Sequence, residues 1–180
     1  MTWTSVLFLL NALTSTAAPV SDLSITPINH VIHERRNVET GDWTRLNRLP
    51  GHKLLPMRIG MTQQNLHLGS DLLAEISHPD SSRFGQHLSS EEIVDLFAPA
   101  QDTVSAVVSW LEENAIEEAR TVLSGNKGWI AFDATVDEAE RLLRTEYYQF
   151  EHTESGHRSF ACDFYHVPEH IQGQIGRAHV

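Results

Sequence analysis

The segment from His78 to Glu92 limits the fold of this chain more than any other, because it ends one helix and begins another. Pro79 disfavours helical geometry at the residue before it, so a helix arriving from the N-terminal side should end near Ser77. The short polar side chains at residues 80–82 favour a turn. Gly85 tolerates backbone angles that other residues avoid. The sequence therefore predicts a stop, a turn and a restart.

Two capping boxes predict where helices begin. In this pattern a Ser or Thr side chain and a Glu three residues later each satisfy a free backbone amide at a helix start. Ser89 and Glu92 form the first box, and Thr135 and Glu138 form the second. The helix after the first box should carry three apolar residues on one face, Ile93, Leu96 and Phe97. The helix after the second should turn four inward, Val136, Ala139, Leu142 and Leu143.

The order of helical and strand patterns predicts the fold class. Strand patterns occur at residues 55–61, 119–124, 129–134 and 147–150. Helical spacing occurs at residues 68–76 and 104–111 and again after Thr135. Pro56 cannot donate to a ladder, so it marks an edge strand or the beginning of a strand. This order indicates an α+β fold, a ferredoxin-like split βαβ antiparallel sheet with helices packed on one face.

Composition excludes several classes of function. A chain of 180 residues with 41% hydrophobic residues can form one domain with a core. The formal net charge of −11 argues against nucleic acid as a partner, since phosphate binding needs a basic face. Cys162 is the only cysteine, so it stays reduced or pairs with a thiol of another chain. His166 and His170 have a zinc-ligand spacing, but Pro168 between them disrupts a helical turn, and we predict no metal site.

The N-terminus has the pattern of a secretory signal peptide. Residues 6–10 are apolar, and small residues at 15–18 offer a cleavage site after Ala17 or Ala18. The apolar stretch is too short to span a bilayer, so no stable membrane insertion is expected. Because no Lys or Arg precedes it, an uncleaved interfacial helix is the alternative. The expected location is secreted and extracellular.

Residues 77–92 also resemble a family motif. They are similar to the Ser-Asp-Pro-x-Ser-x-x-Tyr-Gly-x-x-Leu-Ser-x-Glu-Glu segment of the activation (pro) domain of sedolisins, secreted serine-carboxyl peptidases that include tripeptidyl peptidases. His78 stands where Asp is usual and Phe84 where Tyr is usual, and neither change disturbs the turn or the cap. Further segments resemble the same domain: residues 33–36 with Trp43, residues 61–66, Trp110 with Leu111, and residues 165–171.

The resemblance implies a propeptide that acts as intramolecular chaperone and inhibitor until acid-linked removal. Its partner would be the cognate peptidase catalytic domain, normally in cis, and calcium is implied only for that missing domain. The family's Gly-Thr-Ser-x-x-x-Pro nucleophile motif does not occur here, so no catalytic, cofactor-binding or metal residue is assigned and the chain itself is not expected to be an enzyme. The alternative is a free-standing secreted peptidase inhibitor or protein-binding module.

Five segments follow from these patterns. Residues 1–18 are the signal peptide, residues 19–50 an irregular lead-in, and residues 51–152 the core of the pro domain. Residues 153–174 are expected to be a linker toward the catalytic domain. Residues 175–180 resemble the translation of a common sequencing adapter, which predicts that they are not part of the natural protein. Within the lead-in, Arg35 and Arg36 form either a dibasic processing site or an exposed basic pair.

Overall fold

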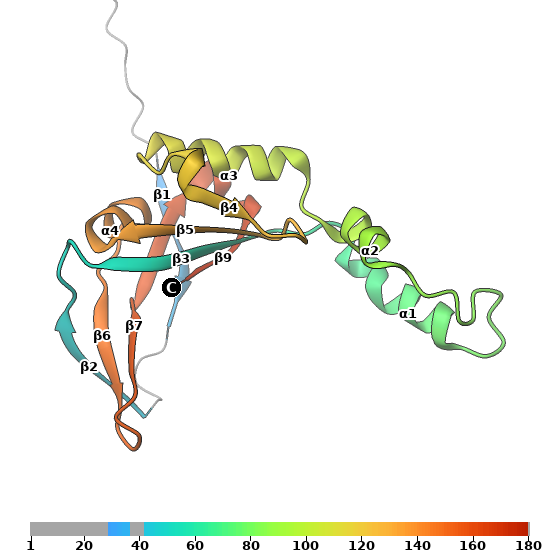
Figure 1. Cartoon of the computed structure of the whole chain (residues 1–180), viewed down its shortest axis with the longest axis horizontal. Coiled ribbons are helices and arrows are strands. Elements are labelled where there is room, and N and C mark those ends of the chain that lie inside the picture. The colour runs from blue at the N-terminus through green and yellow to red at the C-terminus, as the bar shows by residue number, and fades with distance from the viewer. Residues whose placement is uncertain (1–28, 37–41, 180) are drawn as a thin grey trace, which may run out of the picture.

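The computed structural model describes residues 29–36 and 42–179, so the predicted signal peptide lies outside the described residues. Within these ranges the chain forms an α+β body from which an arm of two helices projects (Figure 1). The strands form antiparallel sheets, which confirms the predicted fold class. No helix in the described ranges is long and apolar enough to cross a membrane.

A four-stranded sheet is the centre of the body. Its order is β4 (Thr121–Leu123), β5 (Trp129–Thr135), β3 (Leu54–Met61) and β9 (Ile175–His179). Because β5 pairs antiparallel with both β3 and β4, the latter two strands run parallel with β5 between them, as a split βαβ unit requires. Two helices, α3 (Gln101–Glu113) and α4 (Val136–Leu143), cover one face of this sheet (Figure 1).

The fourth strand of the sheet differs from the prediction. Residues 147–150 were expected to be the last of the four strands in the sheet, but β6 (Tyr148–His152) lies in a second sheet between β2 (Trp43–Arg48) and β7 (Arg158–Ala161). The place beside β3 is taken by β9. A strand pattern shows which side chains can be buried, but the backbone groups of the ladder are the same in every strand. The pattern therefore does not choose the neighbour.

The predicted lead-in and linker are more regular than expected. In a third sheet, β1 (His30–Arg35) from the lead-in pairs with β8 (Phe164–Pro168). The predicted linker 153–174 contains β7, β8 and the 3-10 helix η4 (Glu169–Gln174). Its apolar side chains explain the difference, because several of them are buried in the core: Cys162, Tyr165, Val167 and Ile171.

Two local details refine the predicted strands. The strand predicted at 119–124 is shorter, because η3 (Glu118–Arg120) precedes β4. Pro56 lies at the beginning of β3, before the ladder with β9 starts at Arg58, so its missing N–H leaves no gap on that side. Residues 175–179 form β9, whose Ile175 and Ala178 side chains are buried in the core, and the adapter origin of residues 175–180 stays a prediction.

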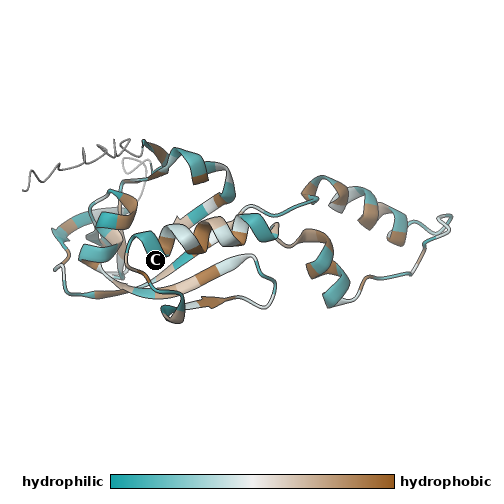
Figure 2. Ribbon diagram, turned by 90° about the horizontal axis from the view of Figure 1, so that it is seen from above, coloured by the Kyte–Doolittle hydropathy of each residue, from teal (hydrophilic) through white to brown (hydrophobic). Residues whose placement is uncertain are grey.

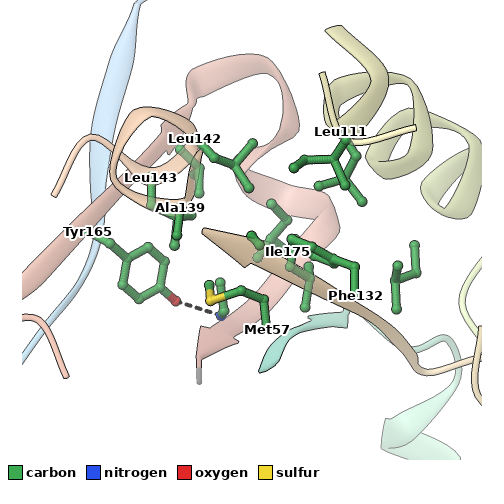
Figure 3. Close-up of a cluster of buried hydrophobic side chains, with 14 of the residues drawn as sticks. Met57, Leu111, Phe132, Ala139, Leu142, Leu143, Tyr165 and Ile175 are labelled. Atoms are coloured by element: carbon green, nitrogen blue, oxygen red, sulfur yellow. Dashed lines mark hydrogen bonds between the residues drawn. The ribbon is translucent and has the colours of Figure 1, made fainter. Parts of the chain in front are cut away.

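The core joins the helices, the sheet and the C-terminal segment (Figure 3). Met57 and Phe132 of the sheet face Leu142 of α4 and Leu111 of α3, as the stripes in the sequence predict. The Tyr165 hydroxyl accepts a hydrogen bond from the Ala178 backbone N–H at 2.9 Å. Burial raises the pKa of Tyr165 to about 12, so the ring stays neutral and anchors β9 to the core.

The arm contains η2 (Leu66–Leu68), α1 (Gly69–Ser77) and α2 (Ser90–Phe97). The predicted stop and restart are confirmed. The first helix ends at Ser77 before an extended His78, and Gly85 has φ +72°. The capping box at the start of α2 is complete. Both views show the arm reaching away from the body (Figures 1 and 2).

Candidate functional site

The face of the four-stranded sheet opposite α3 and α4 is the candidate site. Side chains alternate along β3 and β5, so the residues that do not point into the core point to this second face. We call it the open face. Its members come from all four strands: Leu54, Pro56 and Arg58 on β3, Val122 on β4, Trp129, Ala131 and Asp133 on β5, and Arg177 on β9.

Several large apolar side chains are exposed on the open face. Leu54 is 63% exposed and Val122 is 67% exposed, and Trp129 lies at the edge of the same face. The Trp129 ring lies against Gly60, where an added Cβ would come within 2.9 Å of the ring atom Cζ3. Gly60 therefore lets the indole lie on the backbone of β3, which presents it as a fixed apolar plate.

A hollow of about 370 Å³ borders this plate. Arg58, Val122 and Ala131 line it together with Ser124 and Trp129. Ala131 pairs with Arg58 on one side and with Val122 on the other, so its small side chain forms the floor between two longer ones. The hollow can receive an apolar side chain of a partner, and Arg58 beside it can pair with an acidic group.

An ion pair holds the edge of the open face in place. Arg120, just before β4, donates to Glu138 Oε1 at 2.8 Å and to the carbonyl oxygen of Asp133 at 2.7 Å. Glu138 also accepts the Thr135 backbone N–H at 2.7 Å. The hydrogen bond from Arg120, and after it the one from the Thr135 backbone, lowers the pKa of Glu138 to about 2. The carboxylate therefore joins the outer strand to the start of α4.

The two histidines weighed as metal ligands lie in different elements. His166 lies in β8, where its Nδ1 is 2.9 Å from the carbonyl oxygen of Arg144, and His170 lies in η4. Within residues 29–36 and 42–179, no group of three or more His, Cys, Asp or Glu is arranged to hold a metal ion. Cys162 is buried, and burial raises the pKa of its thiol, which disfavours the reactive thiolate.

Sequence reasoning did not single out the open face as a site. The alternation at residues 55–61 predicted a half-buried strand, but the exposed half was not examined for function. The available signal was an apolar residue at an outward position, as at Leu54 and Val122. Exposed apolar patches can mark sites of interaction with another protein or a ligand.

Comparison with known families matches most of the chain to one family. Residues 41–177 match the family described as "Pro-kumamolisin, activation domain". The match includes the open face, the arm, the whole segment predicted to be a linker and residues 175–177 of the segment predicted to be adapter-derived. It is a match to the activation domain, not to a peptidase domain.

Three fungal proteins are similar to the chain. Tripeptidyl-peptidase sed1 of Aspergillus fumigatus is 51% identical over 166 residues, which are 92% of this chain and 26% of that protein. Aorsin of Aspergillus oryzae is 35% identical over 87% of this chain and 24% of its own length. Tripeptidyl-peptidase SED1 of Arthroderma otae is 31% identical over 82% and 22%. The chain thus spans about a quarter of the length of these relatives.

Proposed function

Since this chain belongs to the pro-kumamolisin activation-domain family, we propose that it is the propeptide of a secreted sedolisin-type peptidase of the tripeptidyl-peptidase kind. In this proposal the domain assists folding of the peptidase domain in cis and blocks its activity until the propeptide is removed. The peptidase activity belongs to the precursor as a whole. This chain contributes the partner surface and no catalytic group.

The open face is the observation that carries this proposal. A sheet with one face covered by helices and the other apolar is suited to packing against a second domain. The relatives are about four times as long as the matched section, which leaves room for such a domain. A face already in its final geometry binds without an ordering cost, and it can also serve as a template for a folding partner.

Secretion and acid-linked removal belong to the same proposal. The apolar stretch at residues 6–10 and the small residues at 15–18 support export. Glu92 and Glu138 hold helix starts through hydrogen bonds that lower the pKa of each carboxyl. Strong acid would protonate them and loosen both helix starts, which supports release at low pH.

The test uses the full chain and mature tripeptidyl-peptidase sed1 of Aspergillus fumigatus, whose corresponding section is 51% identical. We expect the chain to inhibit peptide hydrolysis and to raise the yield of active enzyme when the denatured peptidase domain is refolded. A variant with Leu54→Ser and Val122→Ser should weaken inhibition by about 10- to 100-fold, as expected for loss of two apolar anchors. Both side chains are exposed, so the fold should not change.

Three outcomes separate the alternatives. Inhibition together with assisted refolding supports the propeptide. Inhibition without any effect on refolding favours the free-standing inhibitor that the sequence left open. If the wild-type chain neither inhibits the enzyme nor assists its refolding, the proposed function is wrong.

A further inference from the structure

The arm, residues 62–97, carries no buried residue. Five of its large apolar side chains are exposed: Leu66, Leu68, Leu73, Phe84 and Ile93. Apolar segments are also visible along both helices of the arm in the hydropathy view (Figure 2). Two short helices of this kind do not form a core of their own, and α1 and α2 have only nine and eight residues.

Polar bonds hold the base of the arm closed. The Asn65 side chain donates to the carbonyl oxygen of Leu96 at 2.8 Å, and the Gln64 side chain donates to that of Ala98 at 3.2 Å. Asn65 itself has φ +56°, a left-handed conformation that Asn tolerates better than most residues. These bonds join the two chains of the arm where they leave the body.

A second set of bonds holds the tip. The Gly85 N–H donates to the carbonyl oxygen of Ile76 at 2.9 Å, which ties the turn back to the end of α1. Arg83 pairs with Glu75 at 2.8 Å across the same turn. The Ser89 capping box then fixes the start of α2. The arm is therefore ordered at both ends by polar contacts, while the five large apolar side chains named above remain exposed.

An arm that is ordered although none of its residues is buried is suited to bind a partner. Holding a segment in its bound geometry removes the entropic cost that binding would otherwise carry. The arm also contains six carboxylates and one arginine, Arg83, which is already paired with Glu75. The surface that fits it should therefore be apolar at its centre and basic at its rim.

We propose that the arm is a second docking element, which binds such a patch on the peptidase domain of the same precursor, apart from the patch that receives the open face. This inference rests on the proposed function. The peptidase domain is the occupant that we favour because the relatives extend over about four times the matched length, so most of the precursor is available to cover the arm. Two separated contacts on one rigid domain bind more tightly than either contact alone.

The experiment compares two isoleucines that are equally exposed. Ile93 on α2 and Ile32 on β1 are each 45% exposed, and Ile32 lies outside both the arm and the open face. Inhibition of mature sed1 is measured for Ile93→Ser, for Leu73→Ser with Phe84→Ser, and for Ile32→Ser as the matched control. We expect about tenfold weaker inhibition for Ile93→Ser and more for the double variant, but no change for Ile32→Ser.

Hydrogen exchange of the wild-type chain with and without sed1 gives a second measurement. Amides of α1 and α2 should exchange more slowly in the complex. This protection should weaken when the NaCl concentration is raised, because the rim contact is ionic.

If the wild type inhibits but the arm variants inhibit equally well and the arm amides stay unprotected, the arm does not dock and the proposed function is unaffected. If the wild type does not bind sed1 at all, both proposals are wrong. Self-association of the chain that Leu73→Ser and Phe84→Ser abolish, without an effect on inhibition, would assign the arm to a second copy instead.

Discussion

The body and the arm of this domain reach order by different means. In the body, side chains from the sheet, α3, α4 and the C-terminal segment form one buried cluster. In the arm no residue is buried; the Asn65 side chain bonds the backbone at Leu96 and so joins the two chains of the arm, and the Ser89 cap fixes the start of α2. The body should therefore determine global stability, whereas the arm can open locally at little cost to the rest.

The difference also separates two kinds of sequence feature. Apolar stripes such as the one on α4 organise the body, because hydrophobic burial is the main source of folding free energy. The segment 77–92, which carries the clearest family resemblance, lies in the arm and adds little to the core. A strongly specified segment that contributes little burial is more easily explained by binding than by stability.

The largest contrast should come from removing leucines. Leu142 of α4 is 1% exposed, whereas Leu73 of α1 is 62% exposed. Leu142→Ala should lower the free energy of unfolding by about 2–5 kcal/mol, because it removes buried methyl groups and leaves a cavity. Leu73→Ala should change it by less than about 0.5 kcal/mol. Urea unfolding measures both, and equal losses would show that body and arm share one core.

Two glycines give the next contrast. An added Cβ at Gly60 of the body would lie 2.9 Å from the Trp129 ring, whereas at Gly69 of the arm it would lie 3.9 Å from Phe97 Cζ. Gly60→Ala should displace the indole and cost about 1–3 kcal/mol. Gly69→Ala should be neutral or slightly stabilising, since Ala favours helices. Gly125→Ala, with open space around its Cβ, is the control for Gly60 within the body. A stable Gly60→Ala with unchanged tryptophan fluorescence would disprove the close packing.

Removing the capping side chain of each box tests the same comparison. Loss of such a side chain usually lowers the free energy of unfolding by about 1 kcal/mol. Thr135→Ala should lower global stability by that amount, because α4 packs into the core. Ser89→Ala should instead increase hydrogen exchange at the start of α2 and leave the urea midpoint nearly unchanged, because α2 buries no residue. If both variants shift the midpoint equally, the arm unfolds together with the body.

The smallest expected effect is on acid stability. The pKa of Glu138 is lowered from 4.5 to about 2 by its bonds to Arg120 and Thr135. The contribution of the Glu138 carboxylate to the free energy of unfolding is therefore complete above the unfolded pKa of 4.5, and it fades as the pH falls toward about 2. Glu138→Gln should flatten the dependence of the urea midpoint on pH in this window. Glu92→Gln should leave the pH dependence of the urea midpoint unchanged, because Glu92 belongs to the arm. A comparable flattening in Glu92→Gln would contradict local unfolding of the arm.

Sequence reasoning located most local features correctly. Pro79 ended α1 at Ser77, the two boxes began α2 and α4, and the alternation at 55–61 became β3. Each of these signals acts over a few residues, through the backbone geometry of proline, the free amides of a helix start or the two-residue period of a strand. Such signals can be identified without knowing what lies nearby in space.

Other features were decided only by tertiary packing. The sequence did not show that β6 would leave the central sheet for β2 and β7, or that β9 would pair with β3. It also did not show that segment 153–174 would contribute Tyr165 and Ile171 to the core. Nor could it show that Leu54 and Val122 face outward together, or that Leu73 is left without cover.

The reason is physical. The sequence by itself determined where this chain turns, where its helices begin and which residues are apolar, because these depend on neighbours along the chain. Strand partners and exposed faces depend on contacts between distant segments, and all strands offer the same backbone hydrogen-bonding groups. Only the packing of side chains from those segments chooses among the possible pairings, so the open face and the uncovered arm became visible only in the folded structure.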